Sequence, residues 1–112
     1  MGMILDGQKP EPEVLREIIA RVVQIAHPLR LILFGSAARG EMGSDSDVDL
    51  LVIVQKPIHR RDLAGKIYQN LHGIPVSVDV VVVTENDIRE FGDKIGTVLY
   101  PALKEGVVVY AA

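Results

Sequence analysis

A glycine–serine pair followed by three aspartates is the part of this chain whose residue types could do chemistry. Ten residues separate Gly35-Ser36 from Asp47 and Asp49, and Asp79 follows within a run of valines. An ionised carboxylate in or beside an apolar strand is costly unless something compensates its charge. Two such groups about 4 Å apart repel by roughly 4 kcal/mol even at an effective dielectric near 20. Divalent cations, which bind oxygen ligands, usually compensate the charge of such carboxylates, so the three acids predict a metal site.

The glycine–serine pair predicts phosphate binding beside this metal site. Gly35 follows an apolar run, where a glycine indicates a positive φ or a close approach of the backbone to a ligand. Backbone N–H groups in such turns bind phosphate oxygens. The pair alone is also an ordinary turn sequence. Asp49 and Asp79 are harder to explain structurally, because aspartate is disfavoured in strands.

Two well-known motifs fit this segment only in part. Residues 35–40 have the glycine spacing of a Walker A loop, but Glu41 stands at the lysine position and would repel phosphate. The spaced aspartates also imitate the first ligands of an EF-hand loop. That loop needs glycine at its sixth position and glutamate at its twelfth, where this chain has Leu50 and Lys56. Neither motif explains the pattern.

The hydrophobic pattern predicts alternating helices and strands. In order, we expect a loose lead-in over 1–9, a helix over 12–26, a strand over 29–34, a turn or two of helix within 37–46, a strand over 48–54, a helix over 62–71, a strand over 76–83, a helical region over 84–104 disturbed at Pro101, and a strand over 107–110. Thr84 and Asp87 resemble a capping box with aspartate in place of glutamate. The order predicts an α/β or α+β fold, with a mixed sheet of about four strands flanked by helices.

This layout would bring the acids together at one edge of the sheet. The strand over 48–54 is apolar on both faces, which predicts a central position. A strand–helix–strand crossover makes it parallel to the strand that holds Asp79, so the acidic ends of both strands lie at the same edge. Asp47 and Asp49 are two residues apart, so an extended backbone places them on one face. The strand that ends at Gly35 must then run antiparallel to both.

Length and composition set the limits of the function. The chain has 112 residues, which predicts one domain over 1–112. Its net charge of −3 does not favour extensive nucleic-acid binding, and the absence of cysteine excludes disulfides and thiolate sites. No apolar run is long enough for a membrane helix, and no basic leader precedes the first helix, so we expect a cytoplasmic protein.

Taken together, these segments resemble the DNA polymerase beta-like nucleotidyltransferase superfamily, particularly its minimal nucleotidyltransferase branch. The pattern of that family is a strand ending in Gly-Ser, an Asp-x-Asp that opens the next strand, and a third acid one strand later. Here residues 33–40 read LFGSAARG, residues 46–52 read SDVDLLV and residues 78–80 read VDV. The resemblance covers nearly the whole chain and implies the nucleotidyltransferase fold.

The resemblance also implies a role for each acid. Asp47 and Asp49 would bridge two Mg²⁺ ions, with Mn²⁺ as an alternative, and Asp79 would bind the catalytic ion. Paired ions of this kind stabilise both the attacking and the leaving oxygen of an in-line displacement. The reaction would move a nucleoside monophosphate from ATP or another NTP to a hydroxyl group. Asp79 could also take the proton of that hydroxyl.

Gly35, Ser36 and Arg39 would hold the triphosphate. Gly35 would admit the nucleotide to the backbone, the Ser36 hydroxyl would donate to a phosphate oxygen, and Arg39 would form paired hydrogen bonds. Taken alone, Arg39 fits the surface equally well. Other polar and aromatic residues have structural interpretations: the basic cluster at 59–61 is expected to be a solvated helix start, and the three tyrosines, Tyr68, Tyr100 and Tyr110, are expected to pack.

Members of this branch act as antitoxins beside a helical HEPN-type partner, and some adenylylate a tyrosine of that partner. The resemblance therefore implies a HEPN-type toxin as partner and AMP as the transferred group. Two alternatives stay open: a non-catalytic antitoxin that neutralises its partner by contact, and a transferase that modifies a small molecule such as an antibiotic. A homo-oligomer is compatible with the sequence, which does not fix the acceptor or the base of the NTP.

Overall fold

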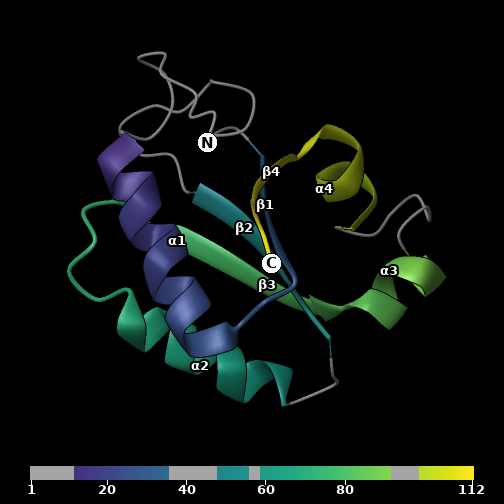
Figure 1. The fold of residues 1–112 in the computed structure, drawn as a ribbon, viewed down its shortest axis with the longest axis horizontal. Coiled ribbons are helices and arrows are strands. Elements are labelled where there is room, and N and C mark those ends of the chain that lie inside the picture. Colours follow the sequence, from purple (N-terminus) through teal and green to yellow (C-terminus); the bar gives the residue numbers. More distant parts are fainter. Residues whose placement is uncertain (1–11, 36–47, 56–58, 92–98) are drawn as a thin grey trace.

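The computed structural model describes residues 12–35, 48–55, 59–91 and 99–112 (Figure 1). Its elements are, in order, α1 (Pro12–Ala26), β1 (Arg30–Phe34), β2 (Val48–Val54), α2 (Arg60–Asn70), β3 (Val78–Thr84), α3 (Glu85–Phe91), α4 (Leu99–Glu105) and β4 (Val107–Ala111). The predicted bounds of α1, α2 and the four strands agree to within two residues. The predicted lead-in and the short helix within 37–46 lie outside the described residues.

The helical region predicted over 84–104 contains two helices, α3 and α4, and residues 92–98 between them lie outside the described residues. Pro101 was expected to disturb a long helix. Instead it is the third residue of α4, where its missing N–H has no helical acceptor to lose. No helix within the described residues is long and apolar enough to cross a membrane.

The four described strands form one mixed sheet in the order β3-β2-β1-β4. β2 and β3 are parallel, whereas β1 is antiparallel to both of its neighbours. The predicted central position of β2 is confirmed, since it lies between β3 and β1 and all its residues except Asp49 are buried. The predicted strand directions are confirmed as well.

The two faces of the sheet are covered by different helices. Side chains of β2 alternate: Leu50 and Val52 pack with α1 and α2, and Leu51 and Ile53 pack with residues of α3 and α4. Figure 1 shows α1 and α2 lying together along one side of the sheet, with α3 and α4 apart from them. Because successive strand residues point to opposite faces, Asp49 belongs to the face of Leu51, on the side of α3 and α4.

The crossover that makes β2 and β3 parallel is fixed to α1 by Arg21. Its guanidinium Nη1 donates to the carbonyl oxygens of Asn70 at 3.2 Å and His72 at 2.9 Å. In return, the Asn70 side chain donates to the Arg21 carbonyl oxygen at 3.0 Å. Gly73 then turns the chain with a φ of 91°, as expected for a glycine after a helix. These bonds fix the point from which the chain returns to start β3.

The predicted capping box at the start of α3 is confirmed. The Thr84 N–H donates to Asp87 Oδ2 at 2.9 Å, and the Asp87 N–H donates to the Thr84 hydroxyl at 3.1 Å. The Arg60 guanidinium also lies 2.8 Å from Asp87 Oδ2. Partial burial raises the pKa of Asp87, but the Thr84 N–H, the Arg60 charge and the Thr84 hydroxyl outweigh it and lower the pKa below its ordinary value.

Asp87→Ala should therefore lower the free energy of unfolding by about 1 kcal/mol at pH 7, the typical effect of losing a cap. A carboxyl whose pKa is depressed by folding stabilises the fold above its unfolded pKa, and this stabilisation is lost as the pH falls through the folded pKa. The difference between the two proteins should shrink below about pH 4. Urea unfolding from pH 7 to pH 3 measures this. Arg60→Ala is the control, since an exposed ion pair contributes little; an equal loss in both variants would contradict the capping role.

Candidate active site

Two of the predicted acids lie side by side at one edge of the sheet. Asp49 is the second residue of β2 and Asp79 the second residue of β3, and the two are register partners in the parallel pair. Both share the face on which Leu51 and Val81 point towards α3 and α4. Asp49 is half-buried and Asp79 is exposed. Adjacent strands lie about 4.8 Å apart, so the two carboxylates can reach a common point.

The turn after β1 lies against the first of these acids. Phe34, the last residue of β1, is the register partner of Asp49, and Gly35 follows with a φ of 74°. A Cβ at Gly35 would clash with Asp49 Oδ2 and would lie 3.1 Å from Asp49 Cγ. Glycine is therefore required here for two reasons: the positive φ and the close approach of the Asp49 carboxylate.

The structure thus brings together Gly35, Asp49 and Asp79. The other predicted site residues, Ser36, Arg39 and Asp47, lie outside the described residues. In the sequence, Ser36 is bonded directly to Gly35, and Asp47 precedes Val48, the first residue of β2.

The donor set at this edge fits a hard divalent cation. Mg²⁺ is bound by one or two carboxylates together with water and substrate phosphates, and Asp49 and Asp79 supply two carboxylates on one face. No group of three histidine or acidic side chains that could hold a metal is found in the part of the chain that the structure describes. The third predicted ligand, Asp47, lies outside that part.

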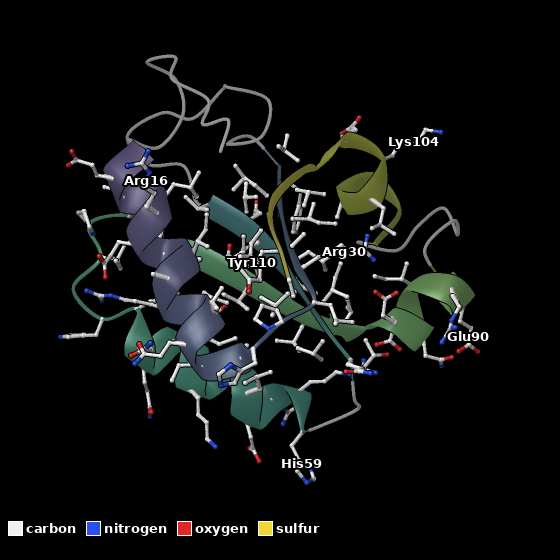
Figure 2. All side chains as sticks on the ribbon, viewed as in Figure 1. Arg16, Arg30, His59, Glu90, Lys104 and Tyr110 are labelled. Atoms are coloured by element: carbon white, nitrogen blue, oxygen red, sulfur yellow. The ribbon has the colours of Figure 1, made fainter. Side chains whose placement is uncertain are left out.

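The opposite ends of the strands, away from Asp49 and Asp79, carry ion pairs. There Arg60 pairs with Asp87, and Arg30 Nη2 lies 3.2 Å from Glu85 Oε1. Figure 2 shows Arg30 on the side of the sheet where α3 begins. These ion pairs attach α3 to β1 and α2 at the carboxyl ends of β2 and β3. α3 therefore starts at the far end of the strands from Asp49 and Asp79.

One contact beside Asp79 was not predicted from the sequence. Tyr68 was expected to pack, but its side chain on α2 is 45% exposed and its hydroxyl accepts a hydrogen bond from the Val80 N–H at 2.8 Å. β3 is an edge strand among the described strands. The Tyr68 hydroxyl therefore binds a backbone N–H on the side of β3 that faces away from β2. No sequence signal indicates this, because the contact depends on how α2 lies across β3. Tyr110 packs as expected, and the Tyr100 side chain lies outside the described residues.

Comparison with known proteins identifies the family of this chain and its fold. Residues 15–106 match the nucleotidyltransferase domain family, so the chain belongs to that family. A Sulfolobus solfataricus protein assigned as a nucleotidyltransferase shares the fold with a TM-score of 0.59 and 22% identity, over 88% of this chain and 78% of that one. A toxin–antitoxin structure solved with AMP-PNP contains a chain with a TM-score of 0.56 and 24% identity, over 85% of this chain and 72% of that one. No curated protein matches the chain.

The family and the fold expected from the sequence are therefore both confirmed. At such low identities, the two solved structures establish the common fold alone. A mixed four-stranded sheet flanked by helices is the architecture that the resemblance implied.

Proposed function

We propose that this chain is an enzyme that transfers a nucleoside monophosphate, AMP from ATP in the first instance, to a hydroxyl acceptor. The observation that supports it best is the in-register pair Asp49 and Asp79, with the Gly35 backbone against the Asp49 carboxylate. Carboxylates for a cation and a glycine turn for a phosphate then lie at the same edge of the sheet. In this proposal residues 1–112 form one catalytic domain, and two Mg²⁺ ions are the cofactors.

Each residue has a definite task in the proposed reaction. Asp47 and Asp49 would hold the two ions, and Asp79 would hold one of them. The bound ions supply charge stabilisation for the attacking and leaving oxygens. Asp79 is exposed, so it can take the proton of the acceptor hydroxyl as that oxygen attacks the α-phosphorus. The bond between the α-phosphorus and the bridging oxygen breaks, and pyrophosphate leaves.

The triphosphate is held by the turn after β1. The positive φ of Gly35 is of the kind that directs successive backbone N–H groups towards an anion. In the proposed complex, the Ser36 hydroxyl donates to a phosphate oxygen and Arg39 forms paired hydrogen bonds with the triphosphate. The positioning of the phosphate therefore depends on the same turn that contacts Asp49.

The proposed partner is a helical HEPN-type toxin, and the proposed acceptor is a tyrosine hydroxyl of that toxin. Support comes from the likeness in fold to a chain of a toxin–antitoxin structure solved with AMP-PNP, together with the resemblance of the motifs. In this role the protein would act in the cytoplasm as an antitoxin that inactivates its partner by adenylylation. An antitoxin that acts by contact alone would bind the partner without modifying it.

Nucleotide with metal should raise the melting temperature of the protein. A ligand that binds only the native state at a hundred times its dissociation constant stabilises by about 2.7 kcal/mol, which corresponds to a shift of about 10 °C in a domain of this size. ATP with Mg²⁺ or Mn²⁺ should produce this shift in the wild type. Asp47→Asn with Asp49→Asn should abolish it, because the cation loses two ligands. Differential scanning fluorimetry measures both.

The matched control is Asp62→Asn, which removes an exposed carboxylate from the first turn of α2. This variant should keep the full shift. Equal stabilisation of the wild type and the double variant by metal and ATP would contradict the metal site at the edge of β2 and β3.

A further inference from the structure

Tyr68 joins α2 to the part of β3 that carries Asp79. Its hydroxyl accepts a hydrogen bond from the Val80 N–H at 2.8 Å, and that N–H belongs to the peptide group between Asp79 and Val80. Because a peptide group is planar, a bond to its nitrogen restrains the plane that also contains the Asp79 Cα atom. The Tyr68 hydroxyl therefore acts directly on the backbone of a proposed metal ligand.

The other side of the same peptide group faces β2. The Val48 N–H donates to the Ser77 carbonyl oxygen at 2.8 Å, so Ser77 turns its carbonyl group towards β2. Backbone groups of successive strand residues point to alternate sides, so Asp79 also turns its carbonyl group to β2, whereas Val80 turns its N–H away. The peptide group that follows Asp79 is thus held by β2 on one side and by Tyr68 on the other.

Asp79 needs this second support because of its place in the sheet. It is the second residue of β3, and β3 has β2 as its one neighbour among the described strands. Asp49, by contrast, lies on a strand between two others. Local opening of a structure is easiest where few contacts hold the backbone, whereas a metal ligand has to keep its position to within about 0.5 Å.

The Tyr68 hydroxyl comes from a well-anchored part of α2. Ile67, the residue before it, is fully buried, and Leu71, three residues after it, is buried as well. Arg21 of α1 donates to the Asn70 carbonyl oxygen, and the Asn70 side chain donates to the Arg21 carbonyl oxygen. The hydroxyl is therefore an acceptor whose position is set by the packing of α1 on α2.

We propose that Tyr68 is a positioning residue for Asp79: its hydroxyl holds the start of β3 so that the Asp79 carboxylate meets its metal ion. This inference rests on the proposed function. Tyr68 binds neither metal nor nucleotide in this role and acts through the backbone of β3. Removal of groups that orient metal ligands from outside the coordination sphere typically lowers metal affinity or activity by roughly 10–100-fold.

Tyr68→Phe tests the proposal, because it removes the hydroxyl and keeps the ring. Mn²⁺ binding to the full chain is followed by electron paramagnetic resonance, with an ATP analogue whose α- and β-phosphorus atoms are joined by a methylene group, so that no pyrophosphate leaves. Tyr68→Phe should weaken Mn²⁺ binding about tenfold. Its melting temperature should stay close to that of the wild type, since the Tyr68 side chain is 45% exposed.

Tyr110→Phe is the matched control. It makes the same chemical change on β4, which lies at the end of the described sheet away from β3. This variant should bind Mn²⁺ as the wild type does. An equal loss of Mn²⁺ binding in Tyr68→Phe and Tyr110→Phe would overturn the proposal.

The Asp79→Ala background separates positioning of the carboxylate from general support of the fold. In that background the carboxylate is absent, so Tyr68→Phe should cause no further loss of Mn²⁺ binding. A bond that only supports the fold would have the same effect with and without Asp79. Equal losses in the two backgrounds, or no loss in either, would overturn the positioning role.

Transfer of labelled AMP gives a second readout. At saturating Mg²⁺, Tyr68→Phe should lower kcat about tenfold and leave the KM for ATP nearly unchanged, because the turn after β1 keeps its structure. A raised KM with an unchanged kcat would overturn the proposal. A wild type that binds Mn²⁺ but transfers no AMP would contradict the proposed function alone, and the Mn²⁺ comparison would still decide the role of Tyr68. A wild type that binds no Mn²⁺ would overturn both.

Discussion

Asp79→Ala should reduce the transfer of labelled AMP to the acceptor by about a thousandfold, equivalent to about 4 kcal/mol of transition-state stabilisation. In the proposed site, this change removes both a ligand of the catalytic ion and the group that takes the acceptor proton. Asp79 is exposed near the start of an edge strand, so the melting temperature should change little. Incubation of the protein and its partner with labelled ATP, with the partner analysed by gel, measures the transfer.

Two further variants separate catalysis from binding. Ser36→Ala should have a milder effect than Asp79→Ala, because it removes one hydroxyl donor and leaves the metal ligands intact. Asp79→Asn keeps the size of the side chain and should be nearly as inactive as Asp79→Ala. If the wild type labels no partner, while Asp79→Ala binds the partner and protects cells as well as the wild type, the contact-only antitoxin is the correct function.

The arrangement of the acids could be predicted because it depends on local patterns and one topological rule. The apolar run over 48–54 predicted a central strand, and the helix after it predicted a parallel return. With those two steps, Asp49 and Asp79 had to lie at the same edge, and they are register partners. The Thr84–Asp87 cap was predictable for the same reason, since a capping box involves residues three apart.

Contacts between distant segments could not be predicted in this way. The bonds from Arg21 to the Asn70 and His72 carbonyl oxygens join residues about fifty positions apart, and an arginine on a helix gives no sign of them. The Tyr68–Val80 bond is of the same kind. The clash that a side chain at Gly35 would make with Asp49 also needs the register of two strands, which the sequence pattern leaves open.

Gly35→Ala should destabilise the protein by about 2–4 kcal/mol and also weaken ATP binding. About 1–2 kcal/mol of this destabilisation comes from the positive φ, which an L-residue adopts with difficulty. The remainder comes from the contact of the new Cβ with the Asp49 carboxylate. Gly35→Val should be worse, because a β-branched side chain is larger and tolerates positive φ poorly. Urea unfolding and ATP titration with Mg²⁺ measure the two effects.

Gly73 provides a matched control that separates backbone strain from the clash. Its φ is 91°, but an added Cβ would meet nothing within 4 Å, so Gly73→Ala should show the φ cost alone and bind ATP normally. In the Asp49→Ala background, Gly35→Ala should cost no more than Gly73→Ala, because the carboxylate that the Cβ meets is gone. If Gly35→Ala is equally destabilising with and without the Asp49 carboxylate, the two residues are not in the contact described. If Gly35→Val binds ATP as well as the wild type, the turn after β1 is structural and does not hold phosphate.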